Sequence, residues 1–264
     1  MAELGVLVVY GYGAELGDFK AFADDLKTTD LAKRFKIVEI VNATLRSDFF
    51  KVLESFGAKQ LIGELHIYTH AWGGGLAFGY KTRVTQENRS RVYQQTIARK
   101  RKIQYIEILD TEIGILFTDD LIRSPYNSKQ AALRAMLAKD AFIKIWGCNS
   151  GVANWRYSDS NVDGSALYDE AVQLDPNNEA IGYYWRALNR QNTPKPAVAQ
   201  AIANFFNCPV YGATSGSSVQ VQYKGTWISS DGYRKATKRW PTEAQILRLH
   251  PDKGNYKKFD PTGK

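Results

Sequence analysis

The chain is poor in cysteine, with only Cys148 and Cys208 among its 264 residues. So few cysteines exclude the disulfide framework that stabilises small secreted domains. Cys148 follows one predicted strand and Cys208 precedes another, so parallel strands would hold them roughly 10 Å or more apart, beyond bridging range. We therefore expect both to be free thiols.

Long apolar runs and histidines are also scarce. No apolar run approaches the roughly 20 residues that span a bilayer, and the first residues, MAELGVLVVYGYG, lack the basic region of a secretory signal. We therefore expect no membrane span and, by default, a cytoplasmic protein, whose export would need a specialised secretion system. The three histidines and two cysteines do not fall at zinc-ligand spacing, so we predict no metal and no cofactor.

Acidic residues are too few to balance the basic ones, which leaves a net charge of +8. Much of the excess lies in Lys81–Lys102 and after Arg234, and such stretches attract polyanions. Interleaved aromatic residues and known nucleic-acid motifs are missing, however. The pattern favours a solvated basic insertion over a nucleic-acid partner, which Lys81–Lys102 nevertheless leaves open.

The regular feature of the sequence is the alternation of short apolar runs with helical patterns. Strands are predicted at residues 5–10, 35–41, 65–69, 142–147 and 209–213, and helices at 18–34, 48–56 after a Ser47 cap, 128–138 after a Ser128 cap, and 196–206. This alternation is typical of a parallel sheet covered by helices. It predicts an α/β fold, a three-layer α/β/α sandwich with a mostly parallel sheet.

We expect a single domain, residues 1–264, interrupted by a basic insertion at 81–127 and ended by a tail at 229–264. Within the insertion, residues 103–109 and 113–117 have the pattern of extra strands. Residues 219–228 alternate around Lys224 and Gly225 like a hairpin. The tail has little pattern, which predicts a loosely packed wrap.

Two stretches end in a reactive side chain: residues 64–75, ELHIYTHAWGGG, and residues 141–151, AFIKIWGCNSG. Each reads as a buried strand that places His70 or Cys148 at its carboxyl end, where open parallel sheets bind ligands. If these strands are neighbours, about 4.8 Å apart, His70 could take the thiol proton and activate Cys148 as a nucleophile. The alternative is that Cys148 is only a small buried hydrophobe.

These motifs resemble the caspase, gingipain and clostripain group of cysteine peptidases. The segments IKIWGCNSG, AVAQAIANFFN and CPVYGATSG are similar to caspase-like domains of bacterial polymorphic toxins and effectors. The resemblance covers residues 5–80 and 141–218, and departs from the family at Ala71, where a glycine usually follows the histidine.

The resemblance implies a peptide or protein substrate, with His70 as general base and Cys148 as nucleophile. Backbone N–H groups of Ala71 or Gly73 and of Cys148 would form the oxyanion hole. The loops expected at the same edge provide the candidate substrate-binding residues, which are Gly11, Tyr12, Trp72, Thr214 and Ser215. The residue preferred in the substrate and the activation mechanism do not follow from the sequence.

Two alternatives use the same residues. THAWGGGLA is similar to the nucleophile elbow of α/β-hydrolases, with Ala71 at the serine position through an engineered or natural replacement. His250 and either Asp159 or Asp163 would then complete a lipase-like or esterase-like triad. The third hypothesis is an inactive binding or effector module on the same scaffold, because a fold does not fix a function.

Overall fold

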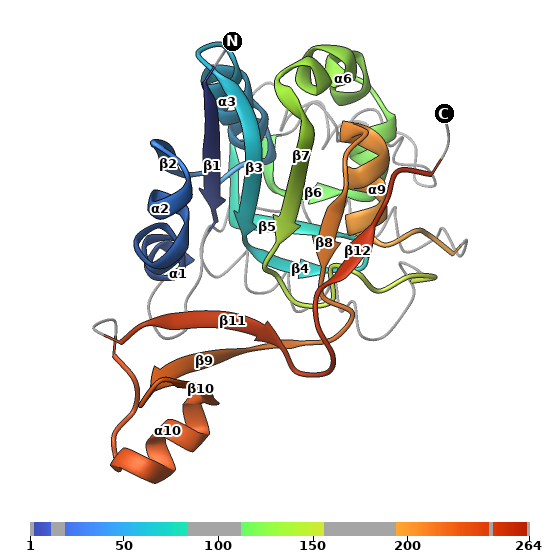
Figure 1. Ribbon diagram of the computed structural model, residues 1–264. Helices are drawn as coiled ribbons and strands as arrows, with labels where there is room; N and C mark the ends of the chain where they lie inside the picture. Colours follow the sequence, from blue (N-terminus) through green and yellow to red (C-terminus); the bar gives the residue numbers. More distant parts are fainter. Residues whose placement is uncertain (1–2, 12–18, 84–111, 156–193, 243–244, 263–264) are drawn as a thin grey trace.

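The computed structural model describes residues 3–11, 19–83, 112–155, 194–242 and 245–262 (Figure 1). The elements in these ranges are, in chain order, β1 (Leu4–Tyr10), α1 (Phe19–Leu26), the π-helix η1 (Lys27–Leu31), α2 (Ala32–Arg34), β2 (Ile37–Asn42), α3 (Arg46–Gly57), β3 (Leu61–Tyr68), β4 (His70–Trp72), β5 (Gly75–Arg83), β6 (Glu112–Phe117), the 3₁₀-helix η2 (Thr118–Ile122), α6 (Tyr126–Ala135), β7 (Leu137–Ile145), α9 (Val198–Phe206), β8 (Val210–Gly212), β9 (Ser217–Tyr223), β10 (Thr226–Ser229), α10 (Ser230–Thr237), β11 (Leu247–Pro251) and β12 (Lys257–Phe259).

The main sheet, within the described ranges, has six strands in the order β12-β8-β7-β3-β1-β2. Neighbouring strands from β8 to β2 are parallel, whereas β12 pairs with β8 in the antiparallel direction. The prediction of an α/β fold with a mostly parallel sheet is therefore confirmed. Among the described helices, none is long and apolar enough to cross a membrane.

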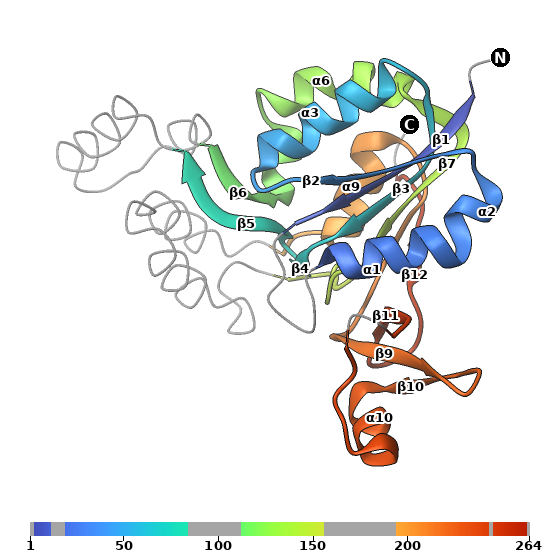
Figure 2. The ribbon, with the colours of Figure 1, turned by 90° about the vertical axis from the view of Figure 1, so that its left-hand side faces the viewer.

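The two faces of strand β1 point into two different apolar clusters. Leu7 and Val9 pack with residues of α3 and α9, whereas Val6 and Val8 pack with Phe19 and other residues of α1. Figure 2 shows α1 on one side of the sheet and α3 and α6 on the other. Because both faces are buried, the sequence of β1 is a continuous apolar run rather than an alternating one.

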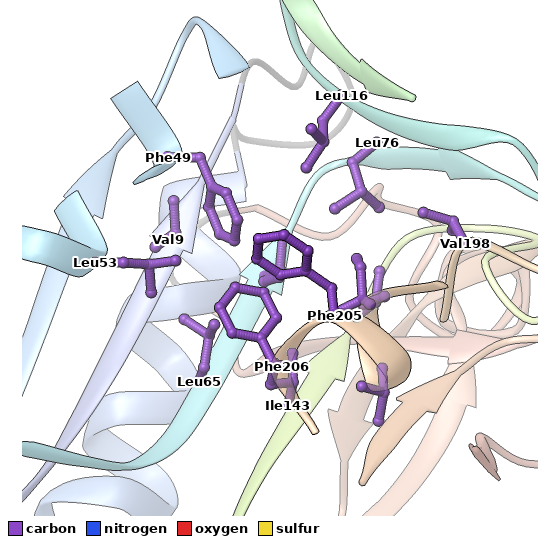
Figure 3. Close-up of a cluster of buried hydrophobic side chains, with 14 of the residues drawn as sticks. Val9, Phe49, Leu53, Leu65, Leu76, Leu116, Ile143, Val198, Phe205 and Phe206 are labelled. Atoms are coloured by element: carbon purple, nitrogen blue, oxygen red, sulfur yellow. The ribbon is translucent and has the colours of Figure 1, made fainter. Parts of the chain in front are cut away.

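The larger cluster centres on two neighbouring phenylalanines of α9 (Figure 3). Phe205 and Phe206 pack edge to face, with ring centroids 4.9 Å apart, and both rings face Phe49, Leu65 and Ile143. All five side chains are at most 2% exposed. This packing fixes α9 on the sheet. The N–H of Ala199 in α9 also donates to the carbonyl of Ser150, so the helix holds the loop after β7.

Both predicted serine caps are wrong. Helix α3 begins at Arg46, and the carboxylate of Asp48 accepts the N–H of Leu45 at 3.1 Å, so an acidic side chain replaces the expected Ser47 cap. The Ser47 hydroxyl lies in the first turn, buried and without a hydrogen-bond partner in the described structure. Ser128 lies inside α6, where its hydroxyl donates to the carbonyl of Pro125 at 2.6 Å.

Two small sheets extend the main one. Strands β4, β5 and β6 form an antiparallel sheet directly after β3, which confirms the strand predicted at 113–117, while residues 103–109 lie outside the described ranges. Strands β9 and β10 form the predicted hairpin, with Lys224 and Gly225 in the left-handed conformation that its tight turn requires.

The prediction of a loosely packed tail is wrong. Strand β11 pairs with β9, and β12 adds the edge strand of the main sheet. Leu247, Leu249 and Phe259 are buried. Strands β9 to β11 and helix α10 make up a separate lobe, residues 217–251, which lies beyond the edge where β1, β3 and β7 end (Figure 1).

Candidate functional site

The ends of strands β3 and β7 bring the two predicted catalytic residues to one edge of the sheet. Ile67 lies opposite Ile145, and the N–H of Trp146 donates to the carbonyl of Ile67 at 2.9 Å. The ends of these two strands thus lie side by side, and His70 and Cys148 each follow one of them by a few residues.

Gly147 shows that the two segments stay in contact beyond the strands. A Cβ at this position would lie 2.5 Å from the carbonyl oxygen of Thr69 and 2.5 Å from the Cβ of Ala71. Only glycine allows so close an approach. The residues that flank His70 are therefore packed directly against the residue before Cys148.

The thiol of Cys148 is half-buried and is held by the start of the lobe. The backbone N–H of Ser217 donates to its Sγ at 3.2 Å, and backbone N–H groups are strong donors to an anionic acceptor. The turn that follows contains Asn149 in the left-handed conformation, with φ of 54°, which asparagine tolerates better than most residues. The hydroxyl of Ser150, fully buried, accepts the N–H of Ala213 at 3.0 Å and fixes the turn to the chain after β8.

The imidazole of His70 is half-buried at the start of β4. Its ring packs edge to face against Phe19 of α1, with centroids 5.1 Å apart, and its backbone lies opposite Ala77 in the β4–β5 ladder. The ring is thus oriented by the helix layer on the α1 side.

The predicted oxyanion residues have different surroundings. Ala71 lies in β4 next to Gly147, and so adjoins the Cys148 turn. Gly73 lies under Trp155, where an added Cβ would be 2.7 Å from the ring, and its carbonyl accepts the N–H of Val198. Gly73 therefore also has a structural role, since it ties the β4–β5 turn to the start of α9.

Two of the predicted substrate-binding residues lie beside the Cys148 turn. The N–H of Asn149 donates to the carbonyl of Ser215 at 2.8 Å. The Ser215 hydroxyl accepts the N–H of Lys253, so this residue links the turn to the segment after β11, and Thr214 is exposed next to it.

Of the other three substrate-binding candidates, the structure describes only Gly11 in full. Gly11 is buried; its N–H donates to the carbonyl of Tyr68 at 2.8 Å, and an added Cβ would lie 2.7 Å from the backbone of Phe78. This glycine is needed for close packing. Tyr12 and the side chain of Trp72 lie outside what the structure describes.

Known protein families, curated proteins and solved structures gave no match to this chain. The interpretation of the site therefore depends on its geometry and on the motifs of the sequence. In the described part of the chain, no cluster of three or more histidine, cysteine or acidic side chains is arranged to hold a metal ion.

The nucleophile-elbow alternative is wrong for Ala71. An elbow is a sharp turn between a strand and a helix, whereas Ala71 lies in the extended strand β4, which turns back into strand β5. His250 lies in β11 of the lobe, with Nδ1 2.8 Å from the carbonyl of Pro251. Asp159 and Asp163 lie outside the described residues.

A buried polar network next to the site is not evident from the sequence. The indole N–H of Trp146 donates to His66 Nδ1 at 3.2 Å, so the imidazole proton is on Nε2, which lies 3.1 Å from Glu64 Oε2. Arg34 pairs with the same carboxylate. His66 is therefore a buried histidine with both ring nitrogens hydrogen-bonded.

The network makes a prediction for acid stability. Burial lowers the pKa of His66 below its ordinary value of 6.5, so the unfolded chain binds this proton at a higher pH than the folded chain. The stability contribution is complete above pH 6.5 and is lost as the pH falls, by up to about 1.4 kcal/mol per pH unit. We expect His66→Gln to reduce the pH slope of the unfolding free energy between about pH 6.5 and 5.

Urea denaturation at several pH values measures this slope. Burial alone would raise the pKa of Glu64, but hydrogen bonds with His66 and Arg34 lower it to about 2. Its contribution is lost only below pH 4.5, in a separate window. His250→Gln in the lobe is the matched control, and an unchanged slope in His66→Gln would contradict the assignment.

Proposed function

We propose that the protein is a caspase-like cysteine peptidase, an α/β/α sandwich that hydrolyses a peptide or amide bond with Cys148 and His70. The observation that supports the proposal is the juxtaposition of two strand ends. Strands β3 and β7 are parallel neighbours, and the segments that carry His70 and Cys148 touch through Gly147. Catalytic groups in open parallel sheets lie at this carboxyl edge.

The proposed chemistry is acyl transfer. His70 takes the proton of Cys148, and the thiolate Sγ attacks the carbonyl carbon to give a tetrahedral intermediate. Backbone N–H groups of Ala71 or Gly73 and of Cys148 stabilise its oxyanion. The C–N bond then breaks, the amine leaves with the proton from His70, and water, activated by His70, hydrolyses the thioester and frees Cys148.

The placement of two further residues supports their predicted role in binding the substrate. Thr214 and Ser215 adjoin the turn after Cys148, and we assign to them contacts with the substrate chain. A role as a bacterial effector is part of the same proposal and is supported by the resemblance of IKIWGCNSG to such domains.

An inactive binding module is the second candidate. One observation favours it: Ala71 occupies the position after the histidine, where the resembled peptidases usually have glycine. The two candidates differ in the reactivity of Cys148.

We expect iodoacetamide to alkylate Cys148 rapidly near pH 7, where ordinary thiols with a pKa of about 8.5 react slowly. Cys208 is the internal control, because burial raises its pKa to about 12. Peptide mass spectrometry measures both rates in one digest. His70→Ala is expected to slow alkylation of Cys148 at least about 10-fold at this pH. Equal rates in the two proteins would contradict a dyad.

A further inference from the structure

A pocket of about 460 Å³ lies between the main sheet and the lobe, and neither His70 nor Cys148 lines it. Phe142 and Trp146 come from β7 and the residue after it, and Trp227 comes from β10. The volume and the aromatic walls are those of a site for a small organic molecule.

The acidic residues of the pocket are already paired. Asp30 and Glu64 both accept hydrogen bonds from the guanidinium of Arg34. Arg34 thus offsets one of the two negative charges, and because it donates hydrogen bonds to both carboxylates, neither is free to pair with a cationic ligand.

The other two cations of the pocket have no carboxylate within ion-pair distance among the described residues. Lys144 Nζ lies over the ring of Trp146, 3.7 Å from its centroid. The guanidinium of Arg248 stacks over Trp227 at 4.2 Å and donates to the side-chain oxygen of Gln220. Both cations thus rest on aromatic rings, and Asp30 and Glu64 act on Lys144 only from beyond ion-pair distance.

Lys144 and Arg248 also repel each other. Burial lowers the pKa of Lys144 to about 8, and the positive charge of Arg248 adds to this effect. A carboxylate placed between the two cations would remove the repulsion and add charge-assisted hydrogen bonds.

We propose that the pocket binds a small aromatic acid, with its carboxylate between Lys144 and Arg248 and its ring against Trp146 and Phe142. A single negative charge fits best, because Asp30 and Glu64, which also line the pocket, oppose a second one. The site is independent of the proposed peptidase reaction, so Cys148→Ala should bind the acid as the unaltered protein does.

Calorimetric titration of the full chain with indole-3-acetate tests the proposal, with the neutral indole-3-acetamide as the matched ligand. The acid is expected to bind at least about 10-fold more tightly than the amide. Lys144→Met and Arg248→Gln are each expected to remove the preference for the acid over the amide. Lys144→Arg keeps the positive charge and should keep the preference. This variant tests the role of the charge even if Lys144→Met destabilises the fold.

Two control variants have similar contacts outside the pocket. Lys257 lies over Phe259 and Arg234 lies over Trp240, so Lys257→Met and Arg234→Gln should bind the acid normally. The proposal is overturned if acid and amide bind equally, if both pocket variants keep the preference, or if no saturable binding occurs up to millimolar acid. In a second assay, the bound acid should slow acetylation of Lys144 by acetic anhydride, read by mass spectrometry.

Discussion

Cys148→Ala is expected to reduce the hydrolysis of peptide amides by at least about 10³-fold, because it removes the atom that forms the acyl intermediate. A library of fluorogenic peptide amides, in which the residue before the scissile bond is varied through all amino acids, measures this loss. The assay therefore does not depend on knowing which residue the site prefers. The half-buried thiol is small, and alanine leaves the Gly147 contact and the Asn149 turn unchanged. The fold should therefore persist.

Cys208→Ala is the matched control, since it removes a thiol that is 6% exposed and lies before β8, away from the Cys148 turn. His70→Ala should lose a similar factor to Cys148→Ala, and the double variant should lose little more, because the two groups act in one step. Peptide hydrolysis that survives Cys148→Ala would refute the proposed function, and circular dichroism would show whether each variant is folded.

Arg46→Met is expected to lower the free energy of unfolding by about 3–5 kcal/mol, the second large effect. Arg46 Nη1 lies 3.0 Å from Asp120 Oδ2, and both side chains are fully buried. Asp120 also accepts the N–H of Phe117 at 2.9 Å, which starts η2. The variant would remove this counter-ion from a buried carboxylate, so urea denaturation should show a much lower midpoint.

Lys20→Met is the control, because Lys20 and Asp24 form a surface pair with side chains 50% and 49% exposed. Its loss should cost less than about 1 kcal/mol. Replacing both buried partners, as Arg46→Met with Asp120→Leu, should recover part of the lost stability. A small effect of Arg46→Met alone would mean that water reaches Asp120 in the folded chain.

Sequence periodicity was enough to predict the centre of the sheet. Strands β1 and β3 are mostly apolar runs buried on both faces, and the second half of β7 buries alternate apolar residues; both patterns are visible without any partner information. The glycine after Trp146 and the lone cysteine that follows it also marked the end of β7. The sequence therefore predicted the α/β class, the β9–β10 hairpin and the two free thiols.

The errors have a common physical cause, which is that short elements depend on partners distant in sequence. Strand β12 has only three residues and gains its hydrogen bonds from β8. The start of α3 depended on a carboxylate three residues after its N-cap, which competes with the more familiar serine signal.

The aromatic pocket needed tertiary structure for the same reason. Lys144 and Arg248 are far apart in the chain and occupy half-buried positions in two different strands. A lysine within an apolar strand gives no sign of the rings it will contact, so neither residue was predicted to belong to a site.

The connection between β8 and β12 has a consequence for how this protein can diversify. The chain leaves the main sheet after Gly212 and returns at Lys257, and these two residues are paired partners in adjacent strands. The entry and exit points are thus within about 6 Å of each other, as at sites where whole modules are gained or exchanged without disturbing a host. Because the exchangeable module provides both the N–H that holds Cys148 and one wall of the aromatic pocket, its replacement would change reactivity and ligand choice together while the sheet stayed the same.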